Sequence, residues 1–125
     1  SANKLTTTSL TNKAGKVVTP TVAAFQAAAA SADWTTAKNF DASMIDTAGE
    51  TAWPIVSATF ILLPKNPADA GQSAEVMKFF DWAYTAGDKA AEDLHYIALP
   101  GAVKDRVRAA WKAEIKDAAG AAIWK

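Results

Sequence analysis

The sequence lacks cysteine altogether, which excludes disulfide bonds and thiolate metal ligands. It also lacks an excess of either charge, because thirteen basic side chains balance thirteen acidic ones. A neutral chain has no electrostatic footprint for nucleic acid, so that class of partner is not expected. No apolar run approaches the roughly 18 residues that a membrane-spanning helix needs. These absences are compatible with either the cytoplasm or the periplasm.

Motifs that carry catalysis or cradle phosphate are lacking as well. The only histidine is His95, and no Gly-x-Ser-x-Gly elbow is present. Because nucleophilic catalysis needs a base beside its nucleophile, we expect a structural or surface histidine and no enzyme. The glycines stand singly, so neither a Gly-x-Gly-x-x-Gly fingerprint nor a P-loop occurs. Arg106 and Arg108 could bind an anion, but the solvated face of a helix is the simpler interpretation.

The length of 125 residues suits one domain, and the composition is half hydrophobic and 21% charged, as in ordinary globular chains. The chain begins with Ser1 rather than methionine and shows no signal peptide. We therefore expect that processing, excision or recombinant trimming generated Ser1, and localisation is not read from this end.

The stretch from Trp53 to Pro64 is the only sustained run that predicts a β-strand. Its apolar side chains would point to both faces, which is typical of a central strand covered on both sides. These residues are Ile55, Val56, Ala58, Phe60, Ile61, Leu62 and Leu63. Such a strand needs paired neighbours, and the chain offers few candidates. The sequence therefore indicates a piece of a larger fold.

Residues 3–18 predict a modest β-hairpin, with a threonine-rich strand over 5–10, a turn at 12–15 and a short return strand at 16–18. Residues 33–52 are expected to be mostly loop. Asp41 and two further carboxylates there lack the Asp-x-Asp-x-Asp-Gly pattern of a calcium loop, so no metal site is expected.

A helix is predicted to begin at Thr19-Pro20, with Thr19 as N-cap and Pro20 at the first helical position. It should run through Val22, Phe25 and the alanines that follow to about residue 32. Its alanines supply helix propensity but little apolar volume. Val22 and Phe25 are therefore its expected anchors.

A second helix is predicted over 70–86, where Asp69 and Gln72 form a plausible capping box and Gly87 a left-handed stop. Apolar residues cover most of its circumference, so its C-terminal half should be largely buried. They are Val76, Met77, Phe79, Phe80, Trp82, Ala83 and Tyr84. We expect core packing rather than ligand stacking for Trp53, Trp82 and Trp111.

Asp88 should cap a short helix through Leu94, and residues 95–100 should form an extended link. The last helix is predicted over 101–116. One apolar stripe should face the core, made of Val103, Val107, Ala110, Trp111 and Ile115. The charged residues are expected outside, namely Lys104, Asp105, Arg108 and Lys112.

Three blocks of the sequence resemble a known family. They are Ala52 to Leu62, Val76 to Tyr84 with Gly87, and Leu99-Pro100 followed by Val107 to Lys112. In order and spacing they are similar to the C-terminal part of phosphate-binding proteins of the phosphate ABC transporter. The stretches Ala-Trp-Pro-Ile and Phe-Phe-Asp-Trp-Ala-Tyr are the most specific, and the resemblance covers nearly the whole chain.

The resemblance implies an α/β fold, namely the C-terminal portion of a two-lobed periplasmic binding protein, helix-rich with one central strand and a short hairpin. Residues 1–50 would end the second lobe, and residues 51–125 would hold the return crossing and the C-terminal part of the first lobe. The parent protein would capture orthophosphate in the periplasm and deliver it to a membrane permease.

The ligand motifs of that family do not occur here. Its phosphate ligands come from a Gly-Ala-Thr-Phe loop, a following serine and aspartate, and an arginine with a Ser-Gly-Thr loop. No phosphate-binding, catalytic, metal or cofactor residue is therefore expected in this segment. The resemblance leaves it a hinge and scaffold role, carried by Trp53, Pro54, Phe80 and Trp82, with the N-terminal portion as partner.

Two alternatives stay open at this point. One is a binding protein of the same fold for another oxyanion, and the other is a stand-alone structural or interaction module. An enzyme would need a nucleophile–base pair assembled by folding, with His95 as its base.

Overall fold

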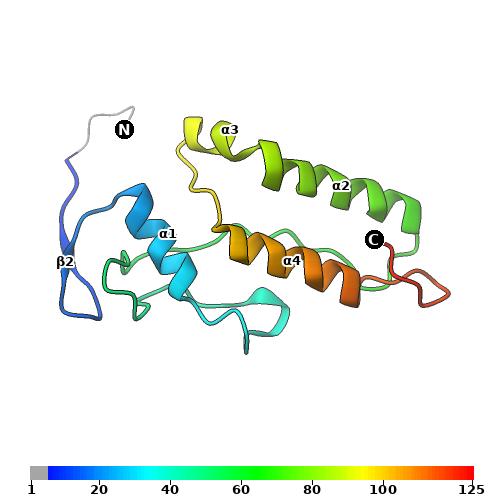
Figure 1. The fold of residues 1–125 in the computed structure, drawn as a ribbon, viewed down its shortest axis with the longest axis horizontal. Coiled ribbons are helices and arrows are strands. Elements are labelled where there is room, and N and C mark those ends of the chain that lie inside the picture. Colours follow the sequence, from blue (N-terminus) through cyan, green and yellow to red (C-terminus); the bar gives the residue numbers. More distant parts are fainter. Residues whose placement is uncertain (1–5) are drawn as a thin grey trace. The chain divides into compact units, whose positions relative to one another are not determined.

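The computed structural model describes residues 6–125, which divide into two compact units. The first unit is formed by the residues up to Thr59 together with His95–Pro100. The second comprises Phe60–Leu94 and Gly101–Lys125. Figure 1 labels β2 and the α-helices, α1 to α4, and each unit is described by itself below.

The first unit opens with the predicted hairpin. Strand β1 (Leu10–Thr11) pairs antiparallel with β2 (Val17–Val18), and Leu10 lies opposite Val18. Gly15 adopts a φ of 74°, the left-handed conformation that glycine adopts without steric penalty. The hairpin is confirmed but is shorter than expected, since residues 6–9 are not strand and Leu5 lies outside the described residues.

Helix α1 (Val22–Ser31) begins later than predicted. Its N-cap is Thr21, whose hydroxyl accepts a hydrogen bond from the backbone N–H of Ala24 at 3.2 Å, so the assignment of Thr19 was wrong. Val22 is 46% exposed and does not anchor the helix. The buried positions are instead small residues, Ala24, Ala28 and Ala29, which allow neighbouring backbone to approach closely.

Residues 33–52 are mostly loop, as predicted, with one short 3-10 helix, η1 (Lys38–Phe40). Asn39 and Phe40 both have positive φ, 53° and 61°. Met44 is buried in this loop, with 4% of its surface exposed, so one of its few large apolar residues contributes to the core.

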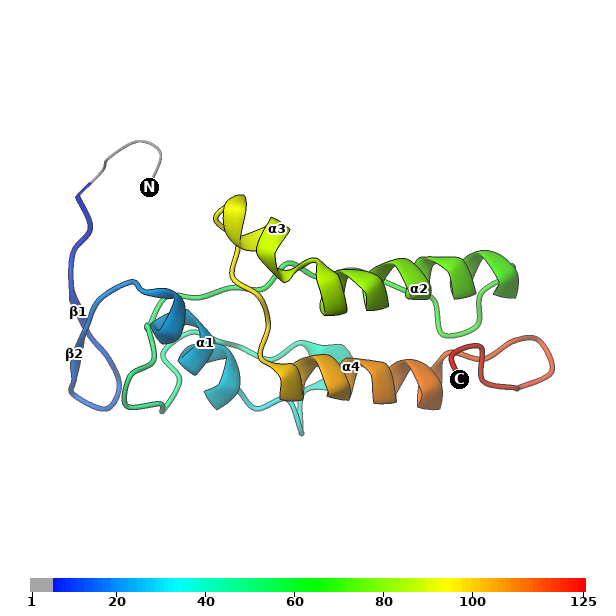
Figure 2. The same ribbon diagram turned by 45° about the horizontal axis from the view of Figure 1, so that its top comes forward.

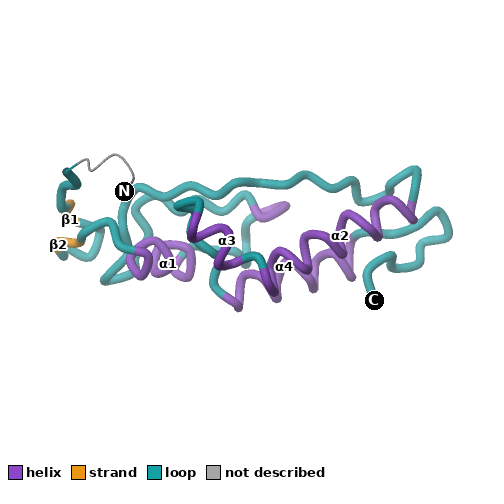
Figure 3. Tube along the Cα trace, turned by 90° about the horizontal axis from the view of Figure 1, so that it is seen from above, coloured by secondary structure: helices purple, strands orange, loops and turns teal. Residues whose placement is uncertain are grey.

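The predicted central strand is not formed. Residues 55–63 are neither helix nor strand, and Figure 3 shows loop between η1 and α2. Within the described part of the chain, no backbone group of this stretch bonds to another backbone group. Ile55 is 67% exposed and Leu62 91%. The correction has a physical reason, because the described strands are two residues long and already pair with each other.

The second unit contains α2 (Ala70–Ala86), α3 (Asp88–Asp93) and α4 (Gly101–Glu114), and the predicted ranges of all three helices are confirmed to within two residues. Helices α2 and α4 lie side by side in Figures 1 and 2. Their core consists of Met77, Trp111 and Ile115. The partly buried residues around it are Leu63, Phe80, Tyr84, Val107, Ile123 and Trp124.

The ends of α2 follow the prediction only in part. Asp69 caps its start, because its carboxylate accepts from the backbone N–H of Gln72 at 2.9 Å. Gly87 has a φ of −86° and is not a left-handed stop. Glycine is needed there for space, since an added Cβ would lie 2.6 Å from the carbonyl oxygen of Ala83.

The expected burial of α2 was also wrong. Among its residues only Met77 is buried, whereas Phe79 and Trp82 are 58% and 57% exposed. These two rings contact each other and lie outside the core that α2 and α4 share.

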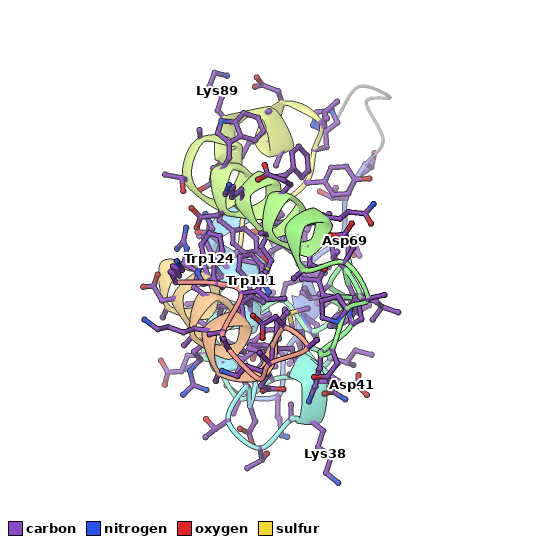
Figure 4. All side chains as sticks on the ribbon, turned by 90° about the vertical axis from the view of Figure 1, so that its right-hand side faces the viewer. Lys38, Asp41, Asp69, Lys89, Trp111 and Trp124 are labelled. Atoms are coloured by element: carbon purple, nitrogen blue, oxygen red, sulfur yellow. The ribbon has the colours of Figure 1, made fainter. Side chains whose placement is uncertain are left out.

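The C-terminal segment folds back onto the core of the second unit. The Ile123 backbone N–H donates to the carbonyl of Ile115 at 3.2 Å. The Trp124 ring meets Trp111 edge-on, with ring centroids 5.5 Å apart, and Figure 4 labels both side chains. None of the helices in the described part of the chain is long and apolar enough to cross a membrane.

Candidate functional site

Trp53 and Pro54, two of the predicted scaffold residues, lie in the first unit. Trp53 is only 8% exposed, and its ring meets Phe25 of α1 edge-on at 6.3 Å. Its backbone N–H donates to the carbonyl of Ala24 at 3.0 Å, while the Pro54 carbonyl accepts from Asp46 at 2.9 Å. Both residues therefore fasten the long loop, Trp53 to α1 and Pro54 to residue 46.

Asn12 is a scaffold residue that sequence analysis missed. Its side chain is buried, and Nδ2 donates to the carbonyl of Glu50 at 2.8 Å and to those of Gly49 and Ala52 at 3.2 Å. Its Oδ1 accepts from the backbone N–H of Lys16 at 3.0 Å. Asparagine at a turn was a readable signal. Carbonyl partners 37–40 residues away were not.

Phe80 and Trp82, the other two predicted scaffold residues, lie on α2 in the second unit. Phe80 is half-buried against the Met77–Trp111–Ile115 core. Trp82 is exposed and contacts Phe79 at a centroid distance of 6.0 Å, so its assignment to the core was wrong. Two of the four predicted residues lie in each unit, Trp53 and Pro54 in the first and Phe80 and Trp82 in the second.

Arg108 is occupied by partners within its own unit. Its Nε donates to Asp81 of α2 at 2.6 Å, and a terminal nitrogen donates to Asp105 at 3.1 Å. A further bond reaches the Thr85 hydroxyl at 3.3 Å. The hydrogen bond to Asp81 is the largest cause of the raised pKa of Arg108. This guanidinium is half-buried scaffold and not simply the solvated face that the sequence suggested.

Lys104 contradicts its predicted exposed position. Only 7% of the residue is exposed, and its Nζ lies 2.6 Å from the Asp88 carboxylate and 3.0 Å from the Tyr84 carbonyl. The aliphatic stem is buried while the ammonium reaches charged and polar acceptors. Asp88 consequently pairs with Lys104 and does not cap α3, whose N-cap makes no side-chain hydrogen bond.

Tyr84 links these ion pairs to the core. Its ring stacks on Trp111 at 5.9 Å with an interplanar angle of 11°, and the Arg108 guanidinium lies 5.9 Å from its ring centroid. Burial raises the pKa of Tyr84, and the nearby charge of Arg108 opposes that rise. The polar groups between α2 and α4 thus bind each other.

Residues 6–125 hold few side chains arranged for catalysis or metal binding. No group of three or more metal-binding side chains is clustered there. His95, the sole histidine, is exposed and adopts a φ of 64°. The arrangement is therefore that of a packed scaffold in which Lys104 and Arg108 each form an ion pair with a carboxylate of their own unit.

Comparison with known proteins gives the class to which this scaffold is similar, that of phosphate-binding proteins. The chain is 42% identical to the phosphate-binding protein PstS of Xylella fastidiosa over 114 residues. It is 40% identical to PstS of Pasteurella multocida over 123 residues and 38% identical to PstS of Haemophilus influenzae over 114. No protein-family profile matches the chain.

These matches cover 91%, 98% and 91% of the chain. The chain spans only 31%, 36% and 34% of the length of these relatives. The resemblance to phosphate-binding proteins read from the sequence is thereby confirmed, for a part of such a protein. These three relatives are named as phosphate-binding proteins.

Proposed function

We propose that this chain is the C-terminal scaffold segment of a periplasmic phosphate-binding protein that supplies orthophosphate to an ABC transporter. In this proposal the chain completes both lobes of an α/β two-lobed fold. Residues 1–50 end the second lobe, and residues 51–125 carry the return crossing and part of the first lobe. The N-terminal portion and the membrane permease are its partners.

The observation that carries the proposal is the unsatisfied stretch 55–63. It is uncharged and rich in β-branched side chains, yet its backbone has no backbone partner among the described residues. A run of exposed apolar side chains such as Leu62 is unfavourable in a finished fold. Strands from the rest of a protein about three times as long would cover these side chains and pair with the backbone of the stretch.

The phosphate ligands belong to that remaining part. Arg108 and Lys104 bind carboxylates and a carbonyl of their own unit, so phosphate would have to displace those partners. Binding proteins can hold an anion through oriented dipoles and hydrogen bonds, so the neutral charge of this chain is no obstacle. Trp53 and Pro54 act at the crossing between lobes, and Phe80 and Trp82 act as scaffold in the first lobe.

A chimera tests the proposal. The matched 36% of Pasteurella multocida PstS is replaced by this chain, and phosphate binding is measured by calorimetry. We expect a cooperatively folded chimera that binds phosphate with an affinity within about tenfold of the relative, because no ligand is exchanged. A folded chimera without phosphate binding would overturn the proposal.

Competition between anions distinguishes a phosphate-binding protein from a binding protein of the same fold for another oxyanion. A binding protein of the same fold for another oxyanion would have its bound phosphate displaced by sulfate or arsenate at equal concentration. In the chimera the ligands come from the relative, so this comparison is made on the parent protein of the present chain. Phosphate retention against both anions supports the phosphate assignment.

A further inference from the structure

Residues 55–63 form a nine-residue segment with unusual properties for an exposed stretch. It contains no charged residue, no glycine and no proline, and it is bounded by Pro54 and Pro64. High β-propensity without charge or proline marks segments that pair with other chains. Four of its apolar residues are strongly exposed, namely Ile55 at 67%, Phe60 at 48%, Ile61 at 54% and Leu62 at 91%.

Both backbone edges of this segment are available. None of its N–H or C=O groups bonds to another backbone group among residues 6–125. Fixed hydrogen bonds begin only at its borders, where the Pro54 carbonyl accepts from Asp46 and the Lys65 carbonyl accepts from Lys116. The segment is thus held at both ends and unpaired between them.

We propose that, in the chain on its own, this segment pairs antiparallel with the same segment of a second copy. Pairing centred on Thr59 sets Ile55 opposite Leu63 and Val56 opposite Leu62. Directly opposed residues point to the same face, so Ile55–Leu63, Val56–Leu62 and Ala58–Phe60 become apolar pairs, while Ser57 lies opposite Ile61 and Thr59 opposite itself. These apolar pairs make the segment largely self-complementary. The chain has no net charge at pH 7, so long-range repulsion between copies is weak.

The second copy is favoured over a foreign partner by this self-complementarity. A partner of either charge would find no ion-pairing group in the segment, because its nearest charged residue along the chain is Lys65. The flanking prolines limit growth of the pairing to the nine residues, since proline cannot donate to a ladder. The inference does not depend on the proposed function, which assigns the same edges to other strands only when the rest of the protein is present.

The absence of cysteine allows a direct test of the register. A Thr59→Cys variant places two thiols in one cross-strand pair, at a Cα separation that a disulfide accepts. Under mild oxidation we expect it to form covalent dimers about tenfold faster, or more, than Ala118→Cys, an exposed control in the C-terminal turn. Equal rates for the two variants would overturn the proposal.

Orientation is tested with a mixture. Val56→Cys and Leu62→Cys chains should cross-link to each other and each only slowly to itself. Fast self-linkage of Val56→Cys would mean parallel pairing and would overturn the antiparallel register.

Sedimentation equilibrium measures the association of the chain without introduced cysteines. The unmodified chain should rise from 13.1 kDa towards twice that mass with increasing concentration. Thr59→Lys should keep it monomeric, because the two introduced charges would lie directly opposite each other in the central pair. The control Ile45→Lys, at a residue 66% exposed in another loop, should not. A chain that stays monomeric at every concentration would contradict the proposal.

Discussion

Arg108 of α4 donates a hydrogen bond to the Asp81 carboxylate of α2 at 2.6 Å, and this pair decides how we interpret one of the two arginines that were candidates for binding an anion. The Arg108 guanidinium is already paired with carboxylates of its own unit, so we do not expect it to bind phosphate. The pair instead fastens the two long helices of the second unit.

Arg108→Ala in the chimera should leave phosphate affinity unchanged and lower the free energy of unfolding by about 1 kcal/mol. Calorimetry measures the affinity and urea denaturation the stability. Lys112→Ala, at an exposed position on the same helix, is the matched control and should change neither. A tenfold loss of phosphate affinity on Arg108→Ala would mean that the ligand set reaches into this segment.

Met77→Ala should destabilise the second unit by about 2–5 kcal/mol, because it leaves a cavity at a side chain with no exposed surface. Phe80→Ala should cost about 3 kcal/mol, at the lower end for phenylalanine because the ring is half-buried. Urea denaturation of each variant gives both values.

Phe79→Ala is the control for these two core substitutions. Its ring is 58% exposed, so in the isolated chain the change should stay within about 0.5 kcal/mol. If Phe79→Ala costs as much as Phe80→Ala, the assignment of the covered side of α2 is wrong.

Asn12→Ala should destabilise the first unit by about 2–3 kcal/mol, since it removes the donor to three carbonyls and the acceptor for Lys16. Hydrogen exchange should show the loss first in residues 49–52. Asn66→Ala, at an exposed asparagine, should have no measurable effect. If the two variants are equally stable, the assignment of Asn12 as a scaffold residue is wrong.

Tyr84 makes stability depend on pH above its ordinary pKa of 10.0. Burial raises the pKa of Tyr84 in the folded chain, so the unfolded chain loses this proton first as the pH rises. The stabilisation is fully present below about pH 10 and is lost as the pH passes through the raised value.

Urea denaturation at increasing pH checks this sign. Above pH 10 the free energy of unfolding should fall more steeply in the unmodified chain than in Tyr84→Phe, which keeps the ring stacked on Trp111. Tyr96→Phe, at a ring 62% exposed, should behave like the unmodified chain. Identical slopes in all three would contradict the account.

The sequence was sufficient to predict those elements that interactions between neighbouring residues stabilise. The Asp69 cap, the hairpin and the range of α4 were predicted because neighbouring residues determine them. The N-cap of α1 was missed by two residues because Thr19 and Thr21 carry the same signal.

The wrong predictions of burial have a different cause from the missed cap. Residues 55–63 and α2 were predicted to be covered, and their exposed faces lack an occupant in the described chain. A pattern of apolar residues predicts that a surface is buried, but not which chain buries it. The buried Lys104 and the role of Asn12 depend on partners distant in sequence, which no local pattern specifies.

Native mass spectrometry with and without phosphate tests the central claim most directly. It is applied to the chain alone and to the chain mixed with the complementary part of Pasteurella multocida PstS. The account predicts no bound phosphate on the chain alone, and one phosphate on the heterocomplex. Phosphate retained by the chain alone, or a heterocomplex that retains none, would contradict the assignment of this chain as ligand-free scaffold.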